Sequence, residues 1–265
     1  MAFPKEYLDL VLFPSGLILM FGYHLFLLYR YLNLPHTTIF GFENHDRRAW
    51  VENVMQARQS SYFFLVLWPF HTLTTGLFGS TSLKGFSIRS PKSSRDTEKK
   101  ENALTVLGSN TNAATFLASV SLTLSSLIGV WIASNSGIFQ SGLVYGDTRP
   151  STISIKYISL LICFILAFSC FVQSARSFIH ANYLVSFENT TLPAKYVELT
   201  VIRGSDFWSL GLRALYFAIN LLLWFFGPVP MFATSLSMVI LLYYLDTNTT
   251  PLHRHRSPGK QLVVS

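Results

Sequence analysis

The chain has 265 residues, of which half are apolar and only 12% are Asp, Glu, Lys or Arg, and its formal net charge is +7. Because an average soluble domain carries about 25% charged residues, this composition excludes an ordinary soluble domain. The apolar residues come in long blocks, not in the short alternation of a soluble core. The sequence therefore predicts an all-α fold, a polytopic transmembrane helical bundle with four to five membrane segments.

The first membrane span is predicted over residues 10–29. This block contains no formal charge and lies between Asp9 and Arg30. At about 1.5 Å per residue its length covers a hydrocarbon core of about 30 Å. Lys5 is the only basic residue before this block, and no signal-peptidase cleavage site with small residues follows the block. We therefore interpret the block as a retained signal anchor and not as a cleaved signal peptide.

A polar segment with the sequence ENHDRRAW follows at residues 43–50. Adjacent arginines next to a tryptophan are typical of contact with anionic lipid headgroups at a membrane interface. We therefore predict headgroup contact for Arg47, Arg48 and Trp50. The acidic residues and the histidine in the same segment match no recognised metal-ligand spacing, so no metal site is predicted here.

A weaker apolar stretch at residues 62–80 is interrupted by Pro69, His71 and Gly76. If it crossed the membrane, the basic residues on its two sides would face opposite compartments. We therefore interpret it as a segment that does not span. Residues 57–97 as a whole show no clear helical period and are predicted to be an inserted loop.

The second span is predicted over residues 113–133 and the third over residues 157–175. Small residues recur every four positions in the second span and would share one helix face. Such a row lets helices approach closely, either inside the protein or at the seam of a homodimer. The predicted packing stripe consists of Ser121, Ser125, Gly129 and Ala133.

The last apolar block, residues 214–245, is too long for one straight crossing at about 1.5 Å per residue unless it tilts strongly. The sequence Gly-Pro-Val-Pro at 227–230 should break it, because proline removes a backbone donor and restricts the preceding residue. A tight helical hairpin, a re-entrant element, or one kinked crossing after an interfacial helix would each fit. The basic tail favours the hairpin, which returns the chain to the cytosol.

Lys and Arg residues are distributed unevenly between the loops, and short loops rich in them tend to stay in the cytosol. The segment between the first two spans and the tail after residue 246 are basic, whereas residues 134–156 are poor in basic residues. We therefore predict an outer or lumenal N-terminus, in the plasma membrane or the endoplasmic reticulum. The acceptor motif that begins at Asn189 would then be unused, and a glycan on Asn189 would overturn this orientation.

Four ionisable residues lie within or at the ends of the predicted spans. Such groups are costly in lipid and often mark a pathway or a site, although near an interface they can also extend to water or form packing hydrogen bonds. The predicted intramembrane polar site consists of His24, Arg176, His180 and Arg213.

No P-loop, dinucleotide fingerprint, nucleophile elbow or HExxH motif occurs in the sequence. We therefore predict no catalytic residues, no cofactor and no bound metal. The excess positive charge lies in loops next to the spans, so it indicates topology and attraction to lipid and not nucleic-acid binding. The expected partners are membrane lipids and a second copy of the chain.

Several blocks of the sequence resemble a known family. They are YLDLVLFPSGLILMFGYHLFLLYR in the first span, RRAWVENVMQ after it, ATFLASVSLTLSSLIGVWI in the second, and FWSLGLRALYFAINLLLWFFGPVPMF near the end. They resemble the plant and bacterial membrane family called domain of unknown function 599. The resemblance covers residues 5–246 and implies a multi-pass membrane protein without supplying an activity. Residues 57–97 depart from the family pattern, which supports the hypothesis of an insertion.

The predicted organisation has four parts, at residues 1–56, 57–97, 98–246 and 247–265. They are the first span with the basic segment, the inserted loop, the membrane bundle and a flexible basic tail. The leading functional hypothesis is a non-enzymatic scaffold that binds lipids or partner proteins. A small transporter or channel subunit is the alternative, because interrupted helices often line binding sites. An intramembrane enzyme using His24 or His180 is the third class.

Overall fold

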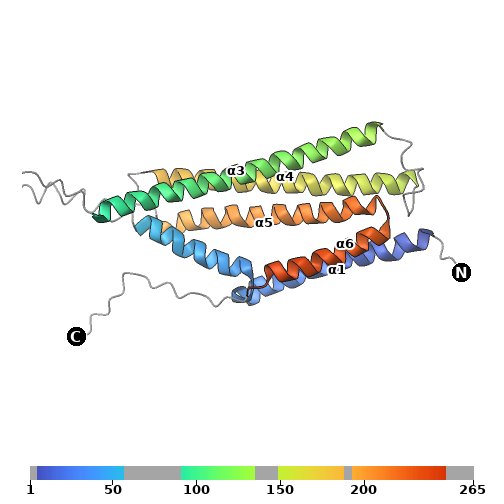
Figure 1. Ribbon diagram of the computed structural model, residues 1–265, viewed down its shortest axis with the longest axis horizontal. Coiled ribbons are helices and arrows are strands. Elements are labelled where there is room, and N and C mark those ends of the chain that lie inside the picture. The colour runs from blue at the N-terminus through green and yellow to red at the C-terminus, as the bar shows by residue number, and fades with distance from the viewer. Residues whose placement is uncertain (1–4, 57–90, 135–148, 188–192, 249–265) are drawn as a thin grey trace, which may run out of the picture. The chain divides into compact units, whose positions relative to one another are not determined.

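The computed structural model describes residues 5–56, 91–134, 149–187 and 193–248 (Figure 1). Within these ranges the regular structure is helical, apart from one isolated antiparallel bridge between Thr38 and Thr247. The predicted all-α fold class is confirmed. The helices are α1 (Lys5–Asn33), the short 3-10 helix η1 (Pro35–Thr37), a helix over 39–56, α3 (Pro91–Ser134), α4 (Pro150–Ser186), α5 (Ala194–Trp224) and α6 (Pro228–Asp246).

Five helices in the described part of the chain are long and apolar enough to cross a membrane. The protein is therefore a multi-pass membrane protein, and the expected four to five membrane segments are confirmed. The candidate spans are Asp9–Asn33, Arg95–Trp131, Pro150–Ser186, Ala194–Trp224 and Pro228–Asp246.

The last apolar block breaks at the Gly-Pro-Val-Pro sequence, as predicted. Helix α5 ends at Trp224, and Gly227 precedes α6. The φ angle of Gly227 is 137°, a backbone conformation that residues other than glycine rarely adopt. Pro228 then starts α6 in the first turn, where its missing N–H costs no helical hydrogen bond. The block therefore forms two helices, each a candidate span, and the hairpin is the alternative that fits.

Three helices are longer than a membrane requires. Helices α3, α4 and α5 contain 44, 37 and 31 residues, which at about 1.5 Å per residue correspond to about 66, 55 and 47 Å. A hydrocarbon core is about 30 Å thick. Each of these helices must therefore continue well beyond the lipid or tilt strongly within it.

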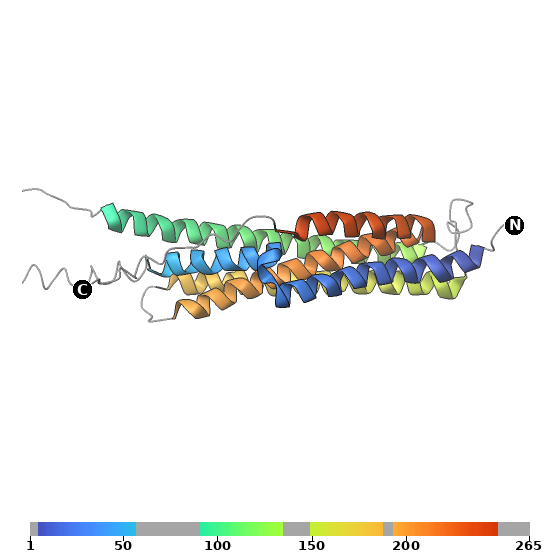
Figure 2. The same cartoon turned by 90° about the horizontal axis from the view of Figure 1, so that it is seen from below.

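The chain divides into two compact units, and each long helix contributes to both. Unit 1 takes its described residues from 1–46, 117–171 and 208–265. Within it α1 packs along α6, and the helices run nearly parallel or antiparallel to one another (Figures 1 and 2). Gly16 permits this close approach, because a Cβ there would lie 3.0 Å from Ser235 Oγ.

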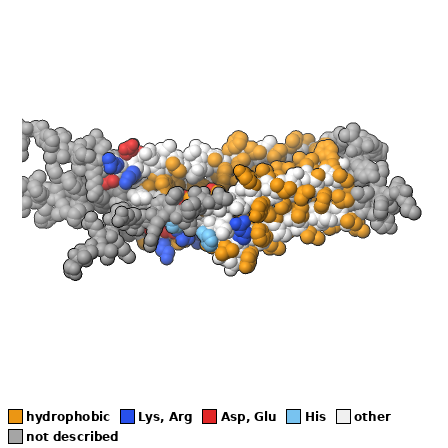
Figure 3. Space-filling model, turned by 60° about the horizontal axis from the view of Figure 1, so that its bottom comes forward, with side chains coloured by type: hydrophobic (Ala, Val, Ile, Leu, Met, Phe, Trp, Pro, Cys, Tyr) orange, Lys and Arg blue, Asp and Glu red, His pale blue; other side chains and the backbone are white. Residues whose placement is uncertain are grey.

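The surface of unit 1 is rich in exposed apolar side chains. Figure 3 shows hydrophobic side chains gathered in a broad band on one face of the molecule, with the visible charged side chains outside the band or at its edge. Such a surface is unfavourable in water and suited to lipid. Exposed apolar residues of unit 1 include Ile18, Phe21, Leu25, Ile158, Ile162, Leu222 and Ile240.

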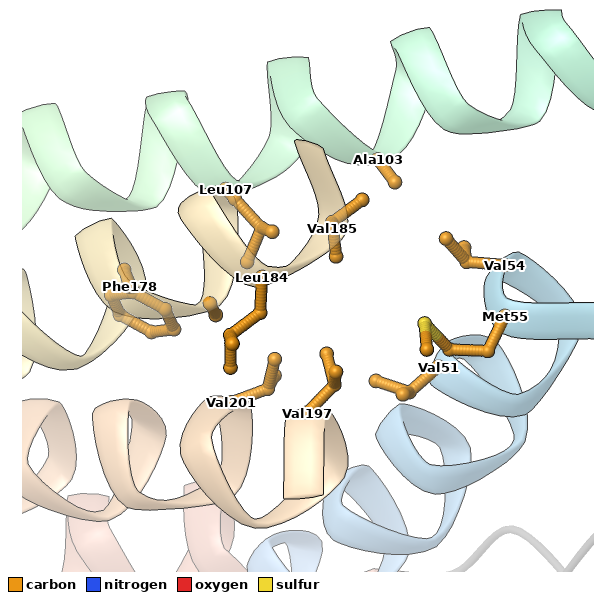
Figure 4. Packing of buried hydrophobic residues seen from close by; sticks show 11 residues of the cluster. Val51, Val54, Met55, Ala103, Leu107, Phe178, Leu184, Val185, Val197 and Val201 are labelled. Carbon is orange, nitrogen blue, oxygen red and sulfur yellow. The ribbon is translucent and has the colours of Figure 1, made fainter. Parts of the chain in front are cut away.

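Unit 2 takes its described residues from 47–116 and 172–207. The 39–56 helix, α3, α4 and α5 each send aliphatic or aromatic side chains into one core, in which Leu107, Ala181 and Val197 are almost fully buried (Figure 4). Trp50, Leu104 and Ala194 pack against its edge. Its exposed positions include charged residues and also apolar ones such as Ile179 and Leu199. The exposed charged residues include Arg48, Lys99, Glu101, Arg176 and Arg203.

Most of the predicted inserted loop, 57–90, lies outside the described residues, as do the apolar stretch at 62–80, Asn189 and the tail from residue 249. The described end of the loop, residues 91–97, forms the first turns of α3. The predicted stripe is buried at Ser121 and Ser125 and exposed at Gly129, and the side chain of Ala133 lies outside the described set. Since a helix has 3.6 residues per turn, positions four apart drift around it.

Candidate functional site

A buried ion pair joins α5 to α6 within unit 1. Arg213 Nη2 lies 2.6 Å from Asp246 Oδ1, and the two side chains are only 11% and 7% exposed. The Tyr23 hydroxyl from α1 donates to Asp246 Oδ2 at 2.6 Å. One carboxylate therefore receives charge-assisted hydrogen bonds from two other helices, and such bonds are stronger than neutral ones.

The turn at Gly227 explains why these residues meet. Helix α6 runs back along the preceding helix, so the end of the last apolar block returns to the level of its beginning. Asp246 is the last residue of α6, and an acidic side chain at a helix C-terminus is unfavourable because the helix dipole is negative there. The guanidinium of Arg213 compensates this charge and the dipole together.

His24 lies next to this ion pair on α1. Its Nδ1 is 2.7 Å from the backbone carbonyl oxygen of Met20. Its ring centroid is 5.5 Å from the Tyr23 ring and 5.0 Å from the ring of Phe217 on α5. His24 Nε2 and Arg213 Nη1 are buried and have no hydrogen-bond partner among the described residues.

Arg30 links the end of α1 to the end of α6 through hydrogen bonds. Its guanidinium donates to the backbone oxygen of Thr37 at 2.8 Å and to Thr247 Oγ1 at 3.4 Å. Asn248 N also donates to the Thr37 oxygen at 3.1 Å, next to the bridge between Thr38 and Thr247. These bonds hold the chain immediately after Asp246 and so help to fix the carboxylate.

A second polar cluster surrounds Trp224 at the C-terminus of α5. The Lys156 ammonium donates to the Trp224 backbone oxygen at 3.1 Å and lies 4.9 Å from the indole centroid. The Trp224 ring stacks on Phe13 with centroids 3.6 Å apart, and its Nε1 donates to Asp9 at 3.2 Å. A cation at the last carbonyls of a helix is favourable.

Asn220 lies between these two clusters on α5. It is 1% exposed, and neither its Nδ2 nor its Oδ1 has a hydrogen-bond partner among the described residues. Positions 213, 217, 220 and 224 recur at helical spacing and share one face of α5. The other three all contact α1 or α6. This face carries the polar side chains of Arg213, Asn220 and Trp224 together with Phe217, and we call it the polar face of α5.

The predicted polar residues are thus divided between the two units. His24 and Arg213 belong to the site in unit 1, whereas Arg176 and His180 lie exposed in unit 2. The ring of His180 contacts Tyr196 of α5, with Nε2 3.3 Å from the hydroxyl. The structure does not bring these two pairs into one site, and a functional role for any of them stays a prediction.

The residues predicted to contact headgroups all lie in unit 2. Arg48 Nε forms an ion pair with Glu198 Oε1 at 3.1 Å, while its side chain stays 60% exposed. Trp50 packs against the hydrophobic core of the unit and is partly buried. Arg48 therefore remains accessible to an anionic group, whereas Trp50 also has a packing role.

Sequence reasoning missed Tyr23, Asn220 and Asp246 as members of the site. Asp246 is the charge that closes the last apolar block, and Arg213 is the charge that opens it. A hairpin between them brings the two charges to the same level, so the pairing could have been found from the hairpin hypothesis. No comparable signal identifies Asn220, because amides also occur on exposed helix faces.

Within the described residues no group of three or more His, Cys, Asp or Glu side chains could hold a metal ion. Residues 11–87 and 92–251 match the sequence model of a family described as "Protein of unknown function, DUF599". No match was found among curated proteins or among solved structures.

Proposed function

We propose that this chain, which belongs to the family described as "Protein of unknown function, DUF599", is a membrane scaffold. Unit 1 anchors it in the bilayer, and unit 2 binds a partner protein next to the membrane surface. No chemical step is needed for this role.

The observation that carries the proposal is the second hydrophobic core. Helices α3, α4 and α5 exceed the thickness of a bilayer, and their charged portions close around the aliphatic core of unit 2 together with the 39–56 helix. A helical bundle with its own core and a charged exterior is typical of a water-exposed domain. Unit 2 therefore suits the binding of a partner protein.

One face of unit 2 has the composition of a protein-binding surface. Tyr and Arg are enriched among the residues that dominate interface energies, and α4 and α5 expose both kinds, joined by the contact between His180 and Tyr196. Basic residues alternate here with apolar ones, which favours an acidic, partly apolar partner segment. The face consists of Arg176, Ile179, His180, Tyr183, Tyr196, Leu199 and Arg203.

Site-specific photocrosslinking in native membranes tests this proposal. A photoreactive amino acid at Tyr183 should give discrete adducts with a protein, whereas the same group at Ile162 of unit 1 should give lipid adducts. The two positions are matched, because their side chains are 57% and 59% exposed and both lie on α4. Absence of a discrete protein adduct at Tyr183 and at Tyr196 would refute partner binding at this face.

The same proposal includes the orientation and the lipid contacts expected from the sequence. Unit 2 and the basic tail face the cytosol, the N-terminus lies outside, and five crossings are consistent with ends on opposite sides. Arg47, Arg48 and Trp50 contact anionic headgroups at the cytosolic surface. Attachment of a glycan to Asn189 in native membranes would contradict this orientation.

A small transporter or channel subunit is the second candidate function. It is favoured by the buried ion pair between Arg213 and Asp246, because ionisable residues inside a membrane bundle often belong to ion pathways. A flux screen in vesicles would reveal it, and a screen without any flux would contradict it.

A further inference from the structure

The polar face of α5 in unit 1 extends between two charged clusters. One end holds Arg213 with Asp246, and the other holds Trp224 with Asp9 and Lys156. Between them lies the amide of Asn220. Polar groups therefore occur along most of the membrane-spanning part of α5, on the side that contacts α1 and α6.

The chemistry of Asn220 points to a ligand. An amide has two donors and an acceptor, and leaving them unpaired inside an apolar interior costs several kcal/mol. Both atoms are without a protein partner among the described residues, and the side chain is 1% exposed, so it lies inside the protein and not on the lipid-facing surface. A small species that both donates and accepts hydrogen bonds, such as water, satisfies the amide.

His24 supplies a proton acceptor on the same seam. The Met20 carbonyl can only accept a hydrogen bond, so the His24 Nδ1 that contacts it carries the hydrogen. In the neutral ring Nε2 then has a lone pair, and it is buried without a partner among the described residues. At the adjacent position of α1, the Tyr23 hydroxyl donates to the Asp246 carboxylate, which pairs with Arg213.

Apolar side chains pack beside the polar groups of the seam between α1 and α5. Met20 is fully buried, and the Phe13 and Trp224 rings stack with centroids 3.6 Å apart. The titratable or charged groups that face the seam are Asp9, Tyr23, His24, Lys156, Arg213 and Asp246, with Arg30 at the end of α1.

We propose that this seam of unit 1 is a hydrated path for protons, with Asn220 holding water at its midpoint and His24 Nε2 as a transient proton acceptor. A hydronium ion transfers a proton to Nε2, which gives the imidazolium and a neutral water. Release of a proton from Nε2 to the next water restores the neutral ring and forms hydronium again, so no co-reactant is consumed. The inference deepens the second candidate function and is independent of the scaffold role.

Cysteine accessibility tests the hydration of the seam. The two native cysteines, Cys163 and Cys170, are first replaced by alanine. In this background a cysteine at position 220 should react with a small charged thiosulfonate about tenfold faster than a cysteine at position 218. The reason is that the reactive thiolate forms only where water reaches the thiol. Ala218 is the matched control, since it is fully buried two residues away in the hydrophobic core. Equal labelling rates in folded protein would overturn the proposal.

Proton flux through the wild-type protein tests the path directly. Phosphatidylcholine vesicles containing the wild-type protein should dissipate a pH gradient faster than protein-free vesicles, and Asn220→Leu and His24→Phe should each return the rate to the protein-free level. The Asn220→Leu variant should keep the melting temperature of the wild-type protein, because the removed amide leaves no protein group without a hydrogen-bond partner. Wild-type vesicles no leakier than protein-free ones would overturn the proposal, even if other solutes crossed and even if Tyr183 crosslinked to a partner.

Discussion

Units 1 and 2 place their polar residues in opposite ways. Unit 1 exposes Ile158 and Ile162 while it buries the ion pair of Arg213 and Asp246. Unit 2 buries Leu107 in an aliphatic core while it exposes Arg48. The same long helices contribute to both units, so the difference cannot come from helix type. Under the proposed function the difference reflects the solvent, with lipid around unit 1 and water around unit 2.

The buried ion pair of unit 1 gives the largest expected effect. Asp246→Ala should lower the free energy of unfolding by about 3–5 kcal/mol, because it leaves the Arg213 guanidinium buried without its counter-ion. Unfolding in mixed detergent micelles measures the loss. The double variant Arg213→Met with Asp246→Leu is the control and should recover most of it. A loss for Asp246→Ala below about 1 kcal/mol would show that the pair is solvated.

The aliphatic core of unit 2 gives the next effect. Leu107 is fully buried, so Leu107→Ala should cost about 2–5 kcal/mol through lost burial and the cavity left behind. The same detergent unfolding assay reports it. Val106→Ala, at a neighbouring position with 47% exposure, is the matched control and should change the stability by less than about 1 kcal/mol. Equal losses at the two positions would mean that unit 2 has no separate core.

The exposed ion pair of unit 2 gives the smallest effect and sharpens the contrast with unit 1. Arg48→Ala should cost about 0–1 kcal/mol, because its pair with Glu198 is open to water and to salt. The difference from Asp246→Ala should persist at high salt, which screens the exposed pair and spares the buried one. A cost for Arg48→Ala as large as that of Asp246→Ala would indicate that unit 2 is not water-exposed.

Much of the helical architecture could be predicted from the sequence, and the site could be predicted only in part. Apolar blocks of membrane length indicate spans directly, and the prolines at 228 and 230 indicate the break. The spans predicted at residues 113–133 and 157–175 are shorter than α3 and α4. Hydropathy identifies only the most apolar part of a helix and not the polar turns that extend the helix beyond that part. His24 and Arg213 could be identified from the sequence, because ionisable residues in or next to an apolar block are unusual. The residues that surround them in the folded site could not.

The sequence by itself determined that the protein spans a membrane several times and that its last block breaks at residues 227–230. Both depend on local chemistry, namely the length of apolar runs and the backbone limits of glycine and proline. Only the tertiary structure decided that Asp246 pairs with Arg213, that Tyr23 joins them, and that Asn220 is buried. Those contacts depend on which faces three helices turn toward one another, and a packing angle between helices is not encoded in any short stretch of sequence.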